Sequence, residues 1–296
     1  MVKNNGVKTQ NSGGAILDSS LISATIKSLY NIKIVDMNTY LQVYIYKNKV
    51  LRSKKVDNSD LNLKNKNISN LLGDKKKTSN DIELTNNIEL KNIMRSKLMC
   101  QRLAKSNIEE WETFITLTFE DTEKFDVTSI TDCNKRLKYF IDKVKRVKKD
   151  FKYLCIPEFQ KRGAVHYHLL TNVNINDNKL MYTQQDNSKF KHIKYWIDGF
   201  SSVEIIKGDP KKVVGYISKY MTKDIDNRLF SKHRYFYSKN LNVPVESYID
   251  LEDNRSKEFY LKKIQDKALI YHNEYLNPYD SNNVTFLEFC KDNTII

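Results

Sequence analysis

Two short β-rich segments separated by five residues are the feature that most restricts how this chain can fold. Residues 151–159 and 165–172 are rich in apolar and aromatic residues, and the residues between them, 160–164, contain Gly163. A connection of this length joins two antiparallel strands directly, so the pair predicts a tight β-hairpin. An antiparallel sheet is therefore expected at the centre of the fold.

The segments around the hairpin predict an α+β domain. Residues 114–119 are rich in β-forming residues and predict a strand, and residues 129–149 carry an apolar stripe at helical spacing. Residues 189–197 are predicted to be helical and residues 201–207 to form a strand, followed by a helix. The order β-α-β-β-α-β-α is that of a ferredoxin-like antiparallel sheet flanked by helices, with one helix added at the end.

This last helix, over residues 210–223, has the sequence PKKVVGYISKYMTK. Asp209 and Pro210 form a helix start signal. At helical period, Tyr216 and Tyr220 lie one turn apart, on a face separate from the apolar stripe. Two phenols among lysines are suited to attacking a phosphodiester, although a surface helix with lysines has the same pattern. The lysines on this face are Lys212, Lys219 and Lys223.

The second strand of the hairpin contains His166 and His168, which face the same side of a strand because they are two residues apart. If the hairpin is centred near Arg162, Glu158 lies directly across from His166. Two imidazoles and a carboxylate suit a divalent metal ion, Mg²⁺ or Mn²⁺. The alternative is a pair of exposed or hydrogen-bonded histidines. Thr116 and Thr118 share one face of the first strand and could line the same site.

The charge of the chain predicts a polyanionic partner. The net charge is +14, from 50 Lys and Arg against 36 Asp and Glu, which favours nucleic acid. The outer face of the helix over 129–149 is basic, and Lys145, Arg146 and Lys149 on it, with Lys212, are predicted to contact DNA. No apolar run is long enough to span a membrane and no signal peptide is recognisable. The expected location is therefore the cytoplasm.

The chain divides into three expected parts. Residues 1–80 are expected to be a largely disordered or linker arm with a possible small hairpin over 40–51. Residues 81–230 are expected to form the domain that contains the histidines and tyrosines. Residues 231–296 are expected to be a C-terminal extension that packs on this domain or contacts DNA.

Three segments in this order resemble the three motifs of HUH endonucleases, the rolling-circle replication initiators of plasmids, single-stranded DNA phages and small circular DNA viruses. They are the strand FITLTF at 114–119, Glu158 with the HYH triplet at 166–168, and YISKYMTK at 216–223. The paired tyrosines are most similar to those of small isometric and filamentous phage initiators and related plasmids. The resemblance covers roughly residues 111–224. It departs from the family in Tyr167, where an aliphatic residue is usual.

The resemblance implies a metal-assisted nicking and strand-joining enzyme. It would cut single-stranded origin DNA or an origin hairpin, form a 5′-phosphotyrosine and leave a 3′-OH primer for a DNA polymerase of the bacterial host. Because the chain lacks a phosphate loop, unwinding would come from a host helicase. Two alternatives stay open: a relaxase or single-strand transposase with the same chemistry, and a non-catalytic nucleic-acid-binding repressor. Histidines in place of aromatic residues on the open sheet face favour the enzyme.

Overall fold

The structure is a computed structural model. It describes residues 29–52, 79–123, 125–184, 187–206, 213, 215, 216, 219, 234–278 and 280–291, with the backbone alone for 79–90, 184 and 187–190. These residues form two antiparallel sheets and three α-helices, which confirms the α+β prediction. The elements are β1 (Leu29–Met37), β2 (Tyr40–Leu51), α2 (Ser79–Ser106), η2 (Ile108–Glu110), β3 (Thr113–Phe119), α3 (Ile130–Val147), β4 (Tyr153–Phe159), β5 (Val165–Thr171), β6 (Met181–Gln184), β7 (Asn187–Ile193), β8 (Gly199–Ile205), β9 (Phe236–Tyr237), β10 (Val245–Ile249), α5 (Asn254–Ile264), β11 (Ala268–Leu276) and β12 (Asn283–Cys290).

The seven-stranded sheet has the order β6-β7-β8-β3-β5-β4-β9. Its four neighbours β8, β3, β5 and β4 have the arrangement expected of a ferredoxin-like sheet. The predicted hairpin is confirmed as β4 and β5, and its turn closes through a hydrogen bond from Gly163 N to Gln160 O of 2.8 Å. Gly163 has a φ of 93°, a conformation that glycine adopts without steric cost.

The prediction of a helix over residues 189–197 is wrong. Residues 189–197 were expected to be helical, but β7 (Asn187–Ile193) is a strand that pairs with β6 and β8. The two strands β6 and β7 therefore occupy the place in the chain where a ferredoxin-like fold has its second helix. β6 and β8, the strands next to β7 in the sequence, offer it partners on both sides, and this pairing overrides the weak local helical pattern.

The helix before the hairpin agrees with its prediction. The side chain of Ser129 caps α3, with Oγ accepting a hydrogen bond from Asp132 N of 3.4 Å. Helix α3 packs its apolar stripe, including Leu137 and Phe140, against one face of the seven-stranded sheet. The opposite face of the same sheet faces α2.

The five-stranded sheet, of order β10-β1-β2-β12-β11, combines the two ends of the described chain. Residues 29–52 were expected within an arm with a possible hairpin over 40–51. They supply β1 and β2 instead: residues 40–51 form the single strand β2, and the turn lies before it, at Asn38 and Thr39. Residues 245–290, expected as an extension, supply β10, β11, β12 and α5. The two segments pair across about 200 residues of sequence, which no local pattern could reveal.

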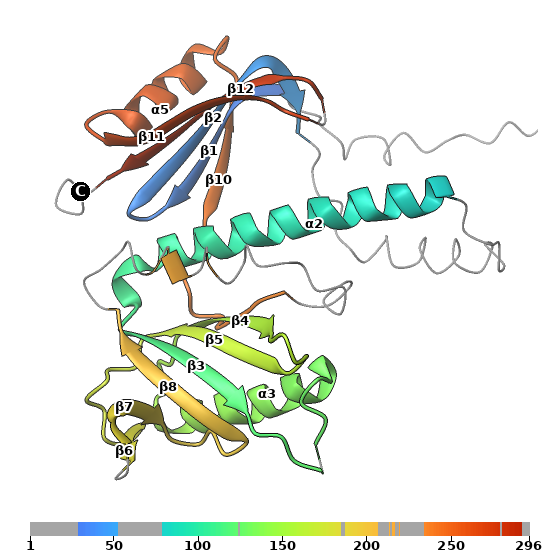
Figure 1. Cartoon of the computed structure of the whole chain (residues 1–296). Helices are drawn as coiled ribbons and strands as arrows, with labels where there is room; N and C mark the ends of the chain where they lie inside the picture. The colour runs from blue at the N-terminus through green and yellow to red at the C-terminus, as the bar shows by residue number, and fades with distance from the viewer. Residues whose placement is uncertain are drawn as a thin grey trace, which may run out of the picture.

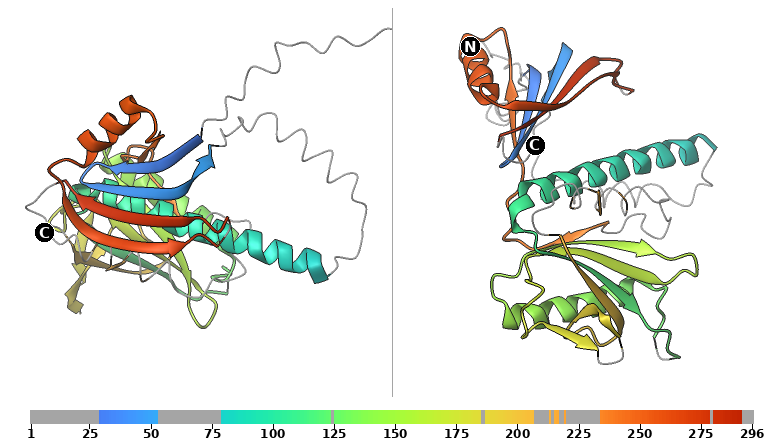
Figure 2. Two further views of the ribbon diagram at one scale, coloured as in Figure 1. Left: turned by 90° about the horizontal axis from the view of Figure 1, so that it is seen from above. Right: turned by 60° about the vertical axis from the view of Figure 1, so that its left-hand side comes forward.

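The layers follow the order α5, five-stranded sheet, α2, seven-stranded sheet, α3 (Figure 1; Figure 2). Three hydrophobic clusters hold the layers together. One joins α3 to the seven-stranded sheet, one joins α5 to the five-stranded sheet, and one surrounds α2 between both sheets. Trp111, which is 1% exposed, fixes the end of α2 by donating from Nε1 to Ala104 O at 2.9 Å.

The five-stranded sheet is also held to its surroundings by ion pairs. The carboxylate of Asp36 on β1 accepts hydrogen bonds from Lys263 of α5 and from Lys291 after β12. Burial raises the pKa of Asp36, but these two ammonium groups outweigh it and hold the pKa below its ordinary value.

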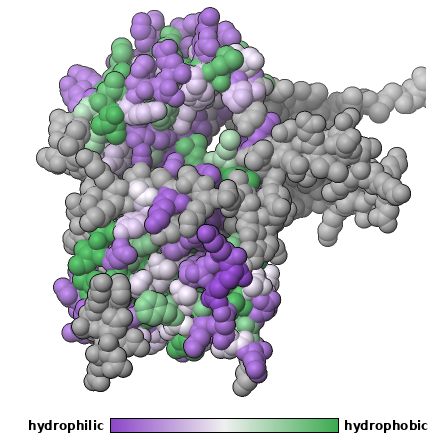
Figure 3. Space-filling model, in the orientation of Figure 1, coloured by the Kyte–Doolittle hydropathy of each residue, from purple (hydrophilic) through white to green (hydrophobic). Residues whose placement is uncertain are grey.

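The face of α5 and the five-stranded sheet that is seen in Figure 3 is largely hydrophilic. Figure 3 shows hydrophilic side chains gathered over α5 and the five-stranded sheet. No helix in the described ranges is long and apolar enough to cross a lipid bilayer.

Candidate functional site

The candidate site lies on the face of the seven-stranded sheet that faces α2. Phe114 and Leu170 of this face belong to the hydrophobic cluster around α2. The strand register places Glu158 opposite His166, as predicted, and places Thr116 opposite His168. Strand alternation then puts the two histidines, Glu158, Thr116 and Thr118 on this same face.

His168 is the most constrained member of the group. It is 5% exposed, and its Nε2 lies 2.6 Å from Glu158 Oε2 while its Nδ1 lies 3.2 Å from Thr116 Oγ1. An ionised carboxylate oxygen can only accept, so Nε2–H donates to Glu158, while the Thr116 hydroxyl either donates to Nδ1 or accepts from it, depending on the protonation of the ring. The ring of His166 is 6.2 Å from that of His168, centroid to centroid.

The donor set has the right chemistry for a divalent metal ion, because two imidazoles and a carboxylate share one sheet face. The described residues contain no group of three His, Cys, Asp or Glu side chains already arranged around a metal position. Glu158 Oε2 and His168 Nε2 are hydrogen bonded instead, and two ligands of one octahedral ion lie about 3 Å apart. Binding therefore needs a small separation of these two atoms and loss of the Nε2 proton.

Tyr167, between the histidines, belongs to the opposite layer. Its ring is fully buried against the α3 cluster, and its hydroxyl donates to Asn134 Oδ1 at 2.6 Å. Burial raises the pKa of Tyr167 well above its ordinary value. This tyrosine is therefore a core residue that fixes β5 on α3, and it is no candidate nucleophile.

The helix predicted to carry the tyrosines is present at its described positions, since Val213, Gly215, Tyr216 and Lys219 are all helical. Its partners Tyr220, Lys223 and Lys212 lie outside the described residues. Lys219 is exposed, as expected of a lysine on this helix.

Tyr216 lies differently from the prediction, which put it on a lysine face away from the core. It is partly buried and packs against the cluster around α2. Its ring stacks on Phe114 with centroids 4.2 Å apart and planes at 10°, and Phe114 is in turn nearly parallel to His168 at 5.8 Å and 8°. The three rings form a stack that leads from the candidate nucleophile to the histidines.

Glu204 was missed by the sequence reasoning. The Tyr216 hydroxyl donates to Glu204 Oε2 at 2.5 Å, and Glu204 on β8 lies directly opposite Phe114 on β3. The only signal in the sequence was the position of Glu204 in the predicted strand over 201–207. Its significance required the register of β8 against β3 and the contact with Tyr216, which the local sequence pattern does not specify.

The predicted DNA contacts of α3 lie behind the sheet. Lys145, Arg146 and Lys149 are exposed at the end of α3. Because α3 covers the face opposite to the histidines, these three basic residues do not share a surface with the candidate site.

Comparison with protein families gave a match over the region that contains the candidate site. Residues 112–225 match the model of a replication-associated protein family, the one that includes the ORF2 proteins. Comparisons with curated proteins and with solved structures gave no match. The matched residues run from the start of β3 to the tyrosine helix and contain the whole candidate site. The segment that carries the site is thus similar to replication-associated proteins, which supports a role as a replication initiator.

Proposed function

We propose that the protein initiates rolling-circle replication by nicking single-stranded origin DNA and later rejoining it. Tyr216 is the first nucleophile in this proposal, and Tyr220 the second. The single observation that carries it is the stack of Tyr216, Phe114 and His168, because it brings a phenol to the same sheet face as two imidazoles and a carboxylate.

The proposed chemical step is a transesterification at phosphorus. The Tyr216 oxygen forms a bond to the phosphorus of the scissile phosphodiester, and the bond from phosphorus to the 3′ oxygen breaks. The products are a 5′-phosphotyrosine and a strand that ends in a 3′-OH, which takes up one proton. Reversal by a 3′-OH rejoins the strand without ATP, because the ester preserves the energy of the phosphodiester.

Glu204 is the proposed acceptor of the phenol proton. It already accepts a hydrogen bond from the Tyr216 hydroxyl, so the proton has a short path to a carboxylate. Phe114 fixes the ring from its flat side, which limits the phenol to positions along the sheet face.

Glu158, His166 and His168 are the proposed holders of Mg²⁺ or Mn²⁺. A divalent ion bound there would lower the cost of the negative charge that develops on the phosphate. Thr116, bonded to Nδ1 of His168, orients this imidazole so that its Nε2 points along the sheet face.

The remaining partners follow from the products. The 3′-OH would be extended by a host DNA polymerase, and a host helicase would separate the strands. Tyr220, one helical turn from Tyr216 in sequence, would make the second cut that ends a replication round.

The test uses a pool of random single-stranded 60-mers with a 3′ label, incubated with protein and Mn²⁺. A nicked strand stays attached to protein through a denaturing gel, and sequencing the attached strands identifies the cleaved sequence. We expect the adduct on Tyr216 or Tyr220 when its peptides are mapped. It should be absent in the Tyr216→Phe/Tyr220→Phe variant and in EDTA.

Two results would overturn the proposal. An adduct on a tyrosine outside residues 216–220 would make the helix a structural element. DNA retention on native gels without any adduct would favour the non-catalytic repressor.

A further inference from the structure

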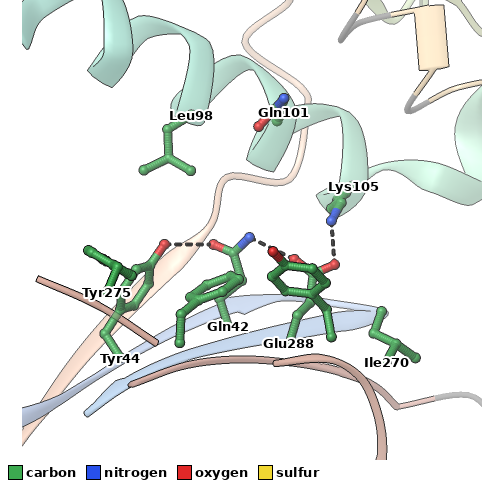
Figure 4. A pocket seen from close by; sticks show the side chains of 10 residues that line it. Gln42, Tyr44, Leu98, Gln101, Lys105, Ile270, Tyr275 and Glu288 are labelled. Atoms are coloured by element: carbon green, nitrogen blue, oxygen red, sulfur yellow. Dashed lines mark hydrogen bonds and ion pairs between the residues drawn. The ribbon is translucent and has the colours of Figure 1, made fainter. Parts of the chain in front are cut away.

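A second site lies on the other side of α2. A pocket of about 530 Å³ is formed between α2 and the strands β2, β12 and β11 of the five-stranded sheet (Figure 4). It shares no residue with the candidate nicking site. Helix α2 nevertheless contacts both the pocket and the cluster that reaches the seven-stranded sheet. Its residues Leu98, Gln101 and Lys105 line the pocket. Its residues Cys100, Leu103 and Ala104 pack in the cluster.

Aromatic rings form one wall of the pocket. Tyr44 and Phe286 are 4.9 Å apart between centroids, and Tyr271 is 5.9 Å from Phe286. Tyr271 is 53% exposed and Tyr275 is 40% exposed, although both line a concave site. Exposed rings in a pocket offer their flat faces to a planar ligand.

Buried polar groups form the floor. Gln42 Nε2 donates to Glu288 Oε2 at 2.8 Å, and Lys105 is ion paired with Glu288 (Figure 4). Arg102 Nε donates to Gln42 Oε1 at 3.0 Å. Gln42 is 6% exposed and Glu288 is 7% exposed. A carboxylate has about four acceptor positions. Glu288 uses two of them in these bonds, which leaves capacity for a donor of a ligand.

The aromatic wall and the polar floor together favour one chemical class of ligand. Because Lys105 is ion paired with Glu288, these two floor residues carry no net charge that would attract a phosphate, and a phosphate group would stay at the rim, near the exposed ends of the tyrosines. A planar group that carries N–H donors on its edge satisfies both the rings and Glu288. Nucleobases with an exocyclic amino group have this form, and a carboxylate pairs well with the N4 amino group of cytosine.

We propose that this pocket binds one base of single-stranded DNA, with Tyr271 and Tyr275 stacking on it and Glu288 accepting from its exocyclic amino group. This proposal rests on the proposed function, because it takes single-stranded DNA as the substrate of the nicking site. The pocket would hold the strand at a second point, on the far side of α2 from the nick.

The experiment measures binding of labelled dC20 and dT20 by fluorescence anisotropy, with the full chain and in EDTA so that nicking does not contribute. Both oligonucleotides carry pyrimidine rings, but only cytosine has an exocyclic amino group, whereas thymine has O4 at that position and a 5-methyl group beside it. The Tyr271→Ala/Tyr275→Ala variant should bind dC20 about tenfold more weakly than wild type, since one base stacked on aromatic rings contributes about 1–3 kcal/mol. Phe259→Ala is the matched control, because Phe259 is a 44% exposed ring on α5, across the five-stranded sheet from the pocket.

Specificity is tested by Glu288→Gln, which should bring the affinity ratio of dC20 to dT20 close to one while dT20 binding stays within about twofold of wild type. Thermal melting shows whether each variant is folded. If Glu288→Gln melts at a lower temperature, the double tyrosine variant decides alone, because both of its residues are exposed.

Several outcomes would overturn the pocket proposal. One is dC20 affinity that is unchanged in the double variant, or lowered equally by Phe259→Ala. Another is free dCMP that competes with dC20 at lower concentration than an oligonucleotide does, which would assign the pocket to nucleotides. A third is a change in sedimentation of the double variant without any loss of DNA binding, which would assign the exposed rings of β11 to a protein contact. Failure of nicking leaves these binding results valid, so the two proposals are separable.

Discussion

Replacing Glu204 by glutamine tests the proposed chemistry most directly. Glu204→Gln keeps the size of the side chain and an oxygen that can accept from the Tyr216 hydroxyl, but it removes the carboxylate that would take the proton. The 2.5 Å contact between these two side chains is exposed at the edge of the α2 cluster, so the substitution should leave the fold intact.

The size of the loss in nicking rate on Glu204→Gln distinguishes two roles of Glu204. If it only positions the phenol, the change replaces a hydrogen bond to a charged group by a neutral one, a difference of about 1 kcal/mol, or roughly fivefold in rate. If it accepts the proton, the loss should reach the range of general base catalysis, about 100-fold or more. We expect the larger loss.

The assay is single-turnover nicking of an oligonucleotide cleaved by the wild type, with excess enzyme and Mn²⁺. Glu204→Asp should recover part of the rate because it restores a carboxylate. A more alkaline buffer should narrow the defect of Glu204→Gln, since phenols then ionise without an acceptor. Glu112→Gln serves as the matched control, because Glu112 lies just before β3 and accepts from Asn174 rather than from the tyrosine.

A rate for Glu204→Gln within about fivefold of wild type would refute the role in proton transfer. A loss of 100-fold that alkaline buffer does not reduce would point instead to a misplaced phenol. Phe114→Leu then distinguishes the two, because it removes the stacking on Tyr216 but keeps an apolar side chain.

Three further predictions concern other parts of the molecule. His168→Ala should abolish nicking while leaving affinity for single-stranded DNA at low salt within about threefold, because bulk affinity comes from phosphate contacts; full cleavage by this variant would exclude it as a metal holder. The triple variant Lys145→Gln/Arg146→Gln/Lys149→Gln should change the slope of log K against log salt by less than the value of about 2 expected from three lost contacts to a single strand, because α3 lies behind the sheet; a full loss would show that the DNA passes there. Asp36→Asn should destabilise the protein at pH 7 and make the stability of the variant fall less steeply in acid than that of the wild type. The reason is that folding lowers the pKa of Asp36. The stabilisation by the Asp36 carboxylate is therefore present above its unfolded pKa of about 3.9 and is lost as the pH falls through its folded pKa. Thermal melting from pH 7 to pH 3 measures this, and parallel curves for wild type and variant would contradict it.

The local features of the site followed from the sequence. Alternation along a strand places His166 and His168 on one face, and the short connection fixes Glu158 opposite His166; both depend only on neighbouring residues. The start of α3 at Ser129 was predictable for the same reason, because a helix cap involves residues three apart.

The long-range features depended on the tertiary structure. Glu204 and Phe114 are 90 residues apart and meet only because β8 pairs with β3, and residues 29–52 find their partners about 200 residues later. Pairing of this kind depends on which distant apolar faces can be buried together, and many alternatives share the same local pattern. Residues 187–193 are a different case, because their partners β6 and β8 are the strands next to them in the sequence, and it is pairing within the sheet rather than the weak helical pattern that decides their conformation. Local sequence therefore determined which side chains face the same way, and only the burial of distant segments against one another determined which of them meet.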